Sequence, residues 1–512
     1  MNNRQRLVLL VTGLFLILLC GGLSYAFFSS INNNESSSTI FAKGGTMKVT
    51  YSDSSGNINI KNIYPKDDAW VSKEFIITGD KSVLIGMKYR IILVVENNTF
   101  TFPLTYSISG SDNWYGYDDQ FVNAENVEIN KYGYQVLGEG NFSETVQGKL
   151  LHYYTLNIYY KPSDKNQNVD QSASFAGRIT VDDGLQELPT DLKTKMLGND
   201  NENVKSNNIT VPGKEVAITN EGIFKTTDDY GDAYYYRGKV DNNYLVFDNS
   251  CWRIVRTTGN GGIKIILYSY MNTNCSYSSS GAAFIKNGQI PSFKFNTSSN
   301  GNGYVGLRYG AANDPGGIFI VHNNQYQSNI LKNMNSFYGI LSTNNKDKLM
   351  DVIWCNDKNP VPGYSGLGLD DSYYAGYARL VNSNIPSLIC TDDVIGSDNY
   401  SKFTVEKTDI GNGDLDYPIG LLTADEAAYA GLVNNTAASD SYLTENATAL
   451  SWWTMTPHSF KDGAAYEWSV STTGALSGTK VDSFLGLRVA LTLKPNSIAT
   501  GTGTKTDPYV VK

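Results

Sequence analysis

The sequence is poor in the side chains that enzymes use for metal-assisted catalysis. It has three histidines in 512 residues, His152, His322 and His458, and no two of them lie within one helical turn. A zinc peptidase needs two or three imidazoles and a carboxylate that converge on the ion, as in the H-E-x-x-H motif. The sequence also lacks a G-x-S-x-G nucleophile motif and a P-loop. We therefore expect no catalytic residue, no metal site and no cofactor, and we interpret the protein as a non-enzyme.

Charge is also scarce. Charged residues make up 18% of the chain and the net charge is −9, whereas nucleic-acid-binding proteins carry concentrated Lys and Arg. We therefore exclude nucleic acid as a partner. Adjacent carboxylates recur and would suit Ca²⁺, but no run matches an EF-hand loop, so we expect them to be solvated. These pairs are Asp118 and Asp119, Asp228 and Asp229, Asp370 and Asp371, and Asp392 and Asp393.

The N-terminal segment contains the one long apolar run. Arg4 and Arg6 precede residues 7–28, which carry no charge, and Ser24 and Ala26 are small residues suited to signal cleavage before Phe27. The run also reaches the roughly 20 residues that span a bilayer. We expect residues 1–28 to be a signal peptide or a transmembrane anchor, which contacts the membrane through residues 7–28 if it is uncleaved. Either alternative places the later residues outside the cell, secreted or on the extracellular face of the membrane.

The cysteine count fits an exported protein. After Cys20 the chain has four cysteines, Cys251, Cys275, Cys355 and Cys390. An even number in an exported region favours disulfides, and four cysteines allow three pairings. Pairing each cysteine with its nearest neighbour closes the shortest loops. Free thiols are an alternative, whereas zinc is disfavoured because no CxxC-like spacing exists.

Residues 40–185 are expected to form a β-sandwich. Tyrosine (35) and glycine (48) are abundant in the whole chain, and both suit strands and turns. Short runs rich in β-branched and aromatic residues alternate here with polar turn clusters. The predicted strands are residues 46–51, 82–95, 98–107, 133–137 and 153–160. Many short strands without a helical period predict a sandwich or a barrel.

A linker and a second, mixed α+β domain are expected to follow. Residues 186–220 contain a short helix signal and an Asn-rich stretch, and we interpret them as the linker. The second domain is expected at 221–495 and a tail strand at 496–512. Residues 252–257 and 263–269 flank a glycine-rich turn and predict a hairpin. Residues 328–341 show a helical period, and Thr423 with Glu426 forms a capping-box sequence.

Three segments mark the N-terminal third: residues 21–28 (GGLSYAFF), 39–45 (TIFAKGG) and 164–177 (DKNQNVDQSASFAG). In these segments the N-terminal third resembles the camelysin/TasA family of secreted Gram-positive proteins. It implies a jelly-roll sandwich, cleavage after Ala26 and a role in biofilm matrix. In fibre-forming members the released N-terminal segment completes the sheet of the next subunit, so the resemblance also implies self-assembly by β-strand addition.

The second domain is marked by residues 234–247 (YYYRGKVDNNYLVF), 251–256 (CWRIVR), 417–426 (YPIGLLTADE), 452–457 (WWTMTP) and 486–494 (GLRVALTLK). In these segments it resembles an uncharacterised domain of Gram-positive surface proteins and is loosely similar to C-type-lectin-like and formylglycine-generating-enzyme-like folds. The enzyme would need a cysteine pair near the C-terminal end of the domain, and no cysteine follows Cys390. The resemblance therefore implies a lectin-like fold without that chemistry.

Aromatic residues are the candidates for ligand binding. Trp452 and Trp453 would place one indole outward if they lie on a half-buried strand, because neighbouring side chains point to opposite faces. Tyr373 beside Asp370 and Asp371 is the second candidate. We expect an extracellular surface or biofilm-matrix protein whose lectin-like module binds a glycan or a surface protein. The alternatives are a purely structural fibre subunit and a secreted enzyme of unknown type.

Overall fold

The protein is mainly β and folds as two units. The computed structural model describes residues 39–42, 45–51, 56–84, 86–112, 119–184, 188, 190–275, 292–310, 324–394, 399–445, 450–495 and 497–511. Unit 1 is Met1–Thr190 and unit 2 is Asp191–Lys512. The expected signal or anchor at 1–28, with Ala26 and Phe27, lies outside the described residues. Within the described residues, no helix has both the length and the apolar character needed to cross a membrane.

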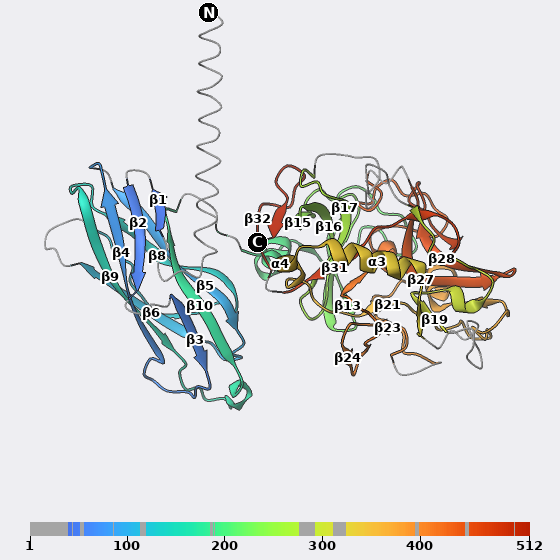
Figure 1. Ribbon diagram of the computed structural model, residues 1–512, viewed down its shortest axis with the longest axis horizontal. Coiled ribbons are helices and arrows are strands. Elements are labelled where there is room, and N and C mark those ends of the chain that lie inside the picture. The colour runs from blue at the N-terminus through green and yellow to red at the C-terminus, as the bar shows by residue number, and fades with distance from the viewer. Residues whose placement is uncertain are drawn as a thin grey trace, which may run out of the picture. The chain divides into compact units, whose positions relative to one another are not determined.

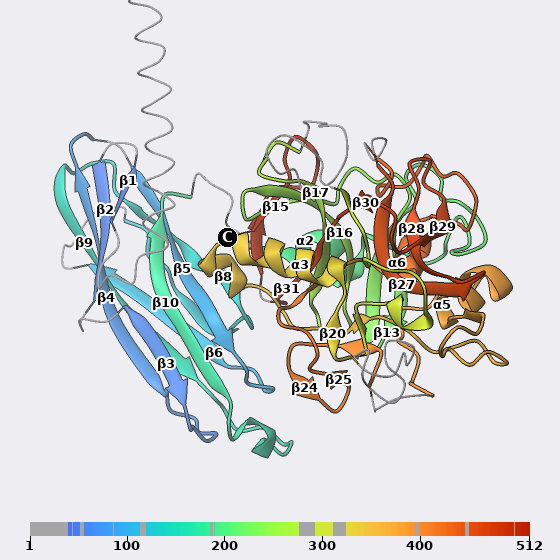
Figure 2. The ribbon, with the colours of Figure 1, turned by 45° about the vertical axis from the view of Figure 1, so that its right-hand side comes forward.

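Unit 1 consists of two antiparallel sheets that enclose one core (Figure 1). The six-stranded sheet has the order β1-β2-β4-β9-β6-β7 and the four-stranded sheet has the order β3-β10-β5-β8. Strands of both sheets run in a similar direction (Figure 2). The strands are β1 (Thr39–Ala42), β2 (Gly45–Tyr51), β3 (Asn57–Lys61), β4 (Val71–Lys81), β5 (Met87–Asn98), β6 (Thr105–Asp112), β7 (Ala124–Glu128), β8 (Gly133–Phe142), β9 (Gly148–Tyr159) and β10 (Ser174–Asp182).

Alternation of buried and exposed residues organises unit 1. In β9 every second residue from Leu150 to Ile158 is buried, and β4 shows the same period from Lys73 onward. Because successive side chains of a strand point to opposite faces, this period places one face of the six-stranded sheet against the core. The sequence analysis predicted β2, β8 and β9 close to their positions. It missed β4, and it extended strands through residues 82–84, 86 and 99–104, which are turns or irregular segments.

The loop before β10 contains residues 166–171 (NQNVDQ). It forms a short 3-10 helix, η1 (Asn168–Asp170). The Asp170 carboxylate accepts hydrogen bonds from the backbone N–H groups of Thr101 and Phe102, at 2.6 and 3.0 Å, and from the Tyr160 hydroxyl at 2.9 Å. Asp170 therefore fastens this loop to the irregular segment between β5 and β6.

Unit 2 is built around a branched eleven-stranded sheet and a six-stranded sheet. Helix α3 (Asn329–Ile340) crosses it in Figure 1 and buries Ile330, Leu331, Met334 and Phe337. The strands of the larger sheet are β11 (Thr190–Asp191), β12 (Val204–Lys205), β13 (Gly222–Asp228), β14 (Gly231–Arg237), β15 (Tyr244–Phe247), β16 (Ser250–Thr257), β17 (Ile263–Ser269), β26 (Ile419–Gly420), β31 (Ala490–Leu493), β32 (Ile498–Thr500) and β33 (Tyr509–Val511).

The smaller sheet and several short elements complete unit 2. The six-stranded sheet consists of β18 (Ser292–Phe293), β22 (Ser372–Tyr373), β27 (Trp452–Lys461), β28 (Ala464–Val470), β29 (Leu476–Lys480) and β30 (Leu485–Gly486). Two-stranded pairs join β19 (Arg308–Tyr309) with β20 (Tyr326–Gln327), β21 (Trp354–Cys355) with β23 (Lys402–Phe403), and β24 (Lys407–Thr408) with β25 (Gly411–Asn412). The helices are α2 (Leu192–Leu197), η2 (Asn199–Asn201), η3 (Asn302–Tyr304), α4 (Thr343–Lys346), α5 (Ala375–Tyr377), the π-helix η5 (Ala378–Ser383) and α6 (Ala424–Tyr429).

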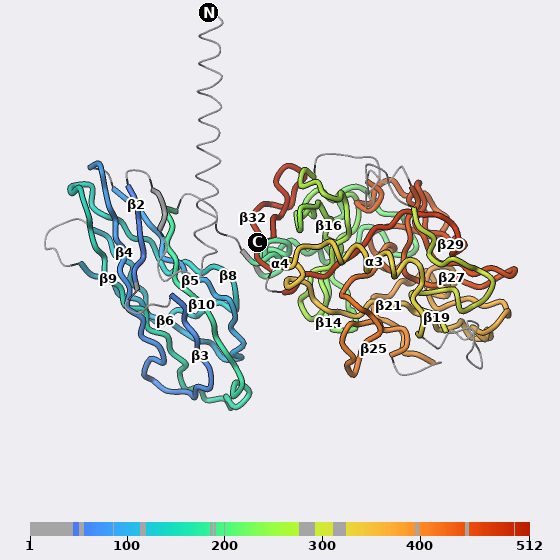
Figure 3. Tube along the Cα trace, viewed as in Figure 1, coloured from blue at the N-terminus to red at the C-terminus, as the bar shows by residue number. Residues whose placement is uncertain are grey.

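The expected linker and tail are both parts of unit 2. From residue 191 onward the segment 186–220 belongs to this unit, where α2 buries Leu192, Met196 and Leu197 and β12 pairs with β13. At the other end, β33 pairs with β15 in parallel, and Figure 3 shows the red C-terminal trace beside the green trace of β16. The segment therefore begins the second unit instead of linking to it, and the tail closes the same sheet.

Local predictions in unit 2 hold where short-range rules decide the structure. Strands β16 and β17 form the expected antiparallel hairpin across the glycine-rich turn. Helix α3 begins after Ser328, whose hydroxyl accepts a hydrogen bond from the Leu331 N–H. The capping box of α6 is present, with Thr423 and Glu426 exchanging hydrogen bonds. These motifs depend on residues within one turn of each other, so the sequence alone predicts them.

Candidate functional site

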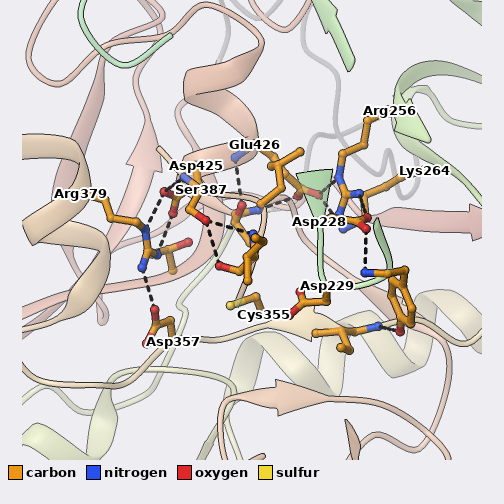
Figure 4. A pocket seen from close by; sticks show the side chains of 16 residues that line it. Asp228, Asp229, Arg256, Lys264, Cys355, Asp357, Arg379, Ser387, Asp425 and Glu426 are labelled. Carbon is orange, nitrogen blue, oxygen red and sulfur yellow. Dashed lines mark hydrogen bonds and ion pairs between the residues drawn. The ribbon is translucent and has the colours of Figure 1, made fainter. Parts of the chain in front are cut away.

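A network of buried charges lines a small pocket in unit 2 (Figure 4). Glu426, on the first turn of α6, is its centre. One carboxylate oxygen accepts hydrogen bonds from Arg256 Nε and Lys264 Nζ, both at 2.7 Å, and the other accepts the Thr423 backbone N–H at 3.0 Å. Arg256 also donates to Asp228 at 2.7 Å. The same carboxylate therefore completes the helix cap and neutralises two cations from β16 and β17.

A second cluster lies on the other side of the pocket in Figure 4. The Arg379 guanidinium, on η5, donates two hydrogen bonds to Asp425, at 2.8 and 3.0 Å, and one to Asp357 at 2.8 Å. Thr391 donates to the same Asp357 oxygen at 2.7 Å. Bidentate pairing of this kind fixes the orientation of the guanidinium. It joins α6 to the chain that follows β21.

Burial and pairing compete in setting the acidity of these groups. Burial alone would raise the pKa of Glu426, but Lys264 and Arg256 lower the pKa of this carboxyl to about 2. Burial lowers the pKa of Lys264 to about 8 against the opposing effect of Glu426. Burial also raises the pKa of Asp229, despite the Cys390 N–H and Lys402 nearby.

The arrangement suits a structural role better than a catalytic one. The free space is about 20 Å³, which holds roughly one water molecule. Each of Arg256, Lys264, Arg379 and Glu426 already bonds to an opposite charge, so none is available as a base or nucleophile. Among the described residues, no group of three His, Cys, Asp or Glu side chains could hold a metal ion.

Both disulfides join nearest neighbours, as the sequence analysis considered. Cys251 bonds to Cys275 and Cys355 bonds to Cys390, with separations of 24 and 35 residues. The second disulfide reaches the pocket wall through Cys355. The first joins β16 to the turn after β17. Each bond therefore closes a loop within unit 2.

Trp452 and Trp453 are both buried, so the expectation that one indole points outward is wrong. Their exposed fractions are 2% and 0%. Strand β27 lies inside its sheet and is covered on both faces, so alternation places neither side chain in solvent. The Trp453 Nε1–H donates to the Phe293 carbonyl at 2.7 Å, and the Arg488 guanidinium stacks 4.8 Å from the Trp452 ring. Neither indole forms a sugar-stacking platform.

Tyr373 lies in a strip of neighbouring aromatic rings, which we call the tyrosine strip: Tyr364, Tyr373, Tyr377 and His458. Ring centroids are 5.3 Å apart for Tyr364 and Tyr373, 4.2 Å for Tyr373 and Tyr377, and 5.2 Å for Tyr377 and His458. Tyr364 is exposed, and the other three rings are partly exposed. The strip is held by β22, α5 and β27, which pack together.

The two predicted carboxylates flank this strip on the loop before β22. Asp370 and Asp371 are both exposed. Asp370 accepts a hydrogen bond from the Ser365 hydroxyl at 3.2 Å, and Asp371 accepts one from the Asp462 N–H at 3.3 Å. Tyr373, Asp370 and Asp371 therefore lie in one region and are at least partly exposed to solvent. Trp452 and Trp453, in contrast, are buried.

The two described histidines lie in different units. His152 is fully buried in unit 1, with Nδ1 2.5 Å from the Tyr89 hydroxyl and Nε2 2.9 Å from the Asp119 carboxylate. His458 packs in the tyrosine strip, and burial lowers the pKa of its imidazole to about 4. His322 lies outside the described residues.

Sequence reasoning missed the buried charge network. Arg256 and Lys264 stand in strands whose residues are all buried, where a cation needs an acidic partner. A cation inside an otherwise apolar run, as in residues 263–267 (IKIIL), is the signal that would have found it. No family model, no curated protein and no solved structure matches the chain.

Proposed function

We propose that the protein works outside the cell as a surface or matrix protein, and that unit 2 binds a glycan at the tyrosine strip. The observation that carries the proposal is the row of partly exposed rings with two exposed carboxylates beside it. Sugar rings have apolar C–H faces that pack on aromatic side chains, and their hydroxyls donate to carboxylates. The strip offers both kinds of contact.

The disulfides support the extracellular part of this proposal. Two intrachain disulfides in one unit are typical of proteins that fold in oxidising surroundings. The apolar segment at 7–28 supplies a route for export or for membrane anchoring. A camelysin/TasA-like jelly roll in unit 1 and a lectin-like fold in unit 2 belong to the same proposal.

Binding of the purified chain to insoluble peptidoglycan and to a panel of soluble oligosaccharides tests the glycan site. Tyr373→Ala should weaken binding about tenfold, because it removes the central ring and a stacked pair contributes about 0.5–1.5 kcal/mol. Tyr326→Ala is the matched control, since Tyr326 is an exposed tyrosine outside the strip. Equal binding by both variants and the unaltered chain, or binding only to a surface protein, would contradict the glycan site.

A structural fibre subunit is the second candidate. It is favoured by β3, a short strand at the edge of the four-stranded sheet, because an edge strand can pair with another chain. Electron microscopy of the purified chain at increasing concentration tests it. Filaments that form without added ligand, and that Ile58→Pro prevents, would favour this candidate over the binder.

A further inference from the structure

Lys358 is an amine buried in unit 2 without a carboxylate partner among the described residues. Its exposed fraction is 1%. Its Nζ lies 2.5 Å from the Arg308 carbonyl oxygen, 3.1 Å from the Tyr400 hydroxyl and 3.3 Å from the Asn324 side-chain oxygen, and the two N–H groups of a neutral amine can donate to two of these three. All three acceptors are neutral. A buried ammonium without an ionic partner is costly, so this environment favours the uncharged amine.

The acidity of Lys358 agrees with that geometry. Burial lowers the pKa of the Lys358 amine to about 7, although Glu467, Asp414 and Asp393 act in the opposite direction. Burial also raises the pKa of Glu467 well above its ordinary value, which weakens this neighbour as a counter-ion for Lys358. An unprotonated lysine is a nucleophile, whereas the ammonium form is not.

Asn324 presents its carboxamide to this amine in a fixed orientation. Its Nδ2 donates to the Asp414 carboxylate at 2.9 Å and to the Tyr400 carbonyl at 3.0 Å. Both partners are acceptors, so the nitrogen must face them and Oδ1 must face Lys358. The nucleophile therefore lies on one side of the carboxamide, and a carboxylate that can assist the leaving nitrogen lies on the other.

We propose that Lys358 and Asn324 form an intramolecular isopeptide bond. The Lys358 Nζ lone pair attacks the Asn324 Cγ, the Nζ–Cγ bond forms and the Cγ–Nδ2 bond breaks. One proton passes from the attacking amine to Nδ2, which leaves as ammonia, and Asp414 promotes this transfer at the Nδ2 end. The reaction consumes no oxidant or reductant, and the product is a secondary amide that keeps the Asn324 carbonyl oxygen.

The bond would add a third covalent tie to unit 2. It joins the residue that precedes β20 to the segment after β21, next to the Cys355–Cys390 disulfide. Unlike a disulfide, this amide withstands reducing agents. Burial of Lys358 also keeps water away from the nitrogen side of the amide and slows hydrolysis.

Mass spectrometry of the reduced, trypsin-digested full chain tests the proposal. The bond predicts a branched peptide that joins residues 309–332 to 349–379, lighter than the two separate peptides by one ammonia, with no cleavage after Lys358. Separate peptides 309–332 and 349–358 of unaltered mass would overturn it. A succinimide at Asn324 also loses ammonia, but it leaves the two peptides separate and would overturn the proposal as well.

Two variants distinguish the reaction from accidental crosslinking. Asn324→Ala should abolish the branched peptide, and Asp414→Asn should reduce its yield at early times after purification, because the promoting carboxylate is lost. Lys264 is the internal control: it is equally buried, but its partner is the Glu426 carboxylate, which has no leaving amide. A branched peptide at Lys264, or an unchanged yield in Asn324→Ala, would contradict the proposed chemistry.

Discussion

The two units of this protein achieve a stable core by different means. Unit 1 uses strands of four to twelve residues, several of which, such as β9, bury one face, while the centre of β5 is buried on both faces, and no disulfide occurs among its described residues. Unit 2 uses many two-residue strands, and its longer strands β16 and β17 are buried on both faces. Long paired strands satisfy their own backbone groups, whereas short segments need other partners.

Unit 2 supplies those partners with side chains and covalent bonds. Its described residues hold both disulfides and the fully buried ion pairs Arg237–Glu221 and Lys264–Glu426. In unit 1 the Asp170 carboxylate binds backbone groups of a loop, and the pairs Arg90–Asp182 and His152–Asp119 join strands to each other or to a loop. The comparison indicates that irregular backbone is stabilised in unit 2 by charge pairing, and in unit 1 by regular hydrogen bonding between strands.

The largest expected effect comes from removing Glu426. Glu426→Ala leaves Arg256 and Lys264 buried without their shared partner and removes the capping box, so it should destabilise unit 2 by about 3–5 kcal/mol. Urea unfolding of the full chain followed by tryptophan fluorescence measures this, because five of the seven tryptophans lie in unit 2. The control is Asp232→Ala, which breaks the exposed pair with Lys225 and should cost under about 1 kcal/mol. Equal losses of unfolding free energy in Glu426→Ala and Asp232→Ala would contradict the expected difference between buried and exposed ion pairs.

Removing a disulfide is the next largest change. The double variant Cys251→Ala and Cys275→Ala opens a loop of 24 residues and should cost unit 2 about 3 kcal/mol in the chain-entropy model. Unit 1 should unfold at the same urea concentration as before, as measured by hydrogen exchange of the β4 and β9 amides. A shift in that unit 1 transition would show that the two units do not unfold independently.

The same contrast explains how far the sequence could predict the fold. In unit 1, β9 was found because period-2 alternation of mostly apolar residues appears in its sequence, whereas β4 was missed because its buried positions include Lys73, Gly79 and Lys81. In unit 2 the Trp452–Trp453 prediction failed because β27 is covered on both faces, which no local pattern records. The capping box and the β16–β17 hairpin were found because their partners are close in sequence.

The Asn-rich segment and the candidate site show the remaining limit. Residues 199–208 have a polar composition typical of a linker, yet Asn203 donates to the Met196 carbonyl and Asn208 accepts from the Tyr235 hydroxyl. In the sequence alone, a polar side chain that hydrogen-bonds within the fold looks the same as one that faces solvent. Tyr373 with Asp370 and Asp371 could be proposed as neighbours because they lie within four residues, whereas Tyr364, Tyr377 and His458 join them only through the tertiary fold.

A smaller effect is expected in unit 1. Asp170→Asn keeps the shape of the side chain but removes its charge and replaces one acceptor oxygen by a donor, facing the Thr101 and Phe102 amides. We expect a loss of about 1–3 kcal/mol in unit 1 and none in unit 2. Hydrogen exchange of β5 and β6 amides measures it. Asp164→Asn, in the same loop and exposed, is the control and should leave exchange unchanged.

The last prediction separates the units by pH. Burial lowers the pKa of His458 from 6.5 to about 4, so between these values the unfolded chain binds a proton that folded unit 2 does not. The stabilisation of folded unit 2 by neutral His458 should therefore be fully present above pH 6.5 and fall as the pH drops toward 4. The stabilisation from the paired Glu426 carboxyl is lost only below its ordinary pKa of 4.5, and the raised pKa of Glu467 acts in the opposite direction to His458, so the difference between the unaltered chain and His458→Gln from pH 6.5 to 4.5 reports the histidine. His458→Gln should flatten the decline seen by tryptophan fluorescence in that range. Burial also lowers the pKa of His152, but Asp119 acts in the opposite direction, so unit 1 should lose less stability over the same pH range. An unchanged slope in His458→Gln would exclude His458 as the source of the decline in unit 2.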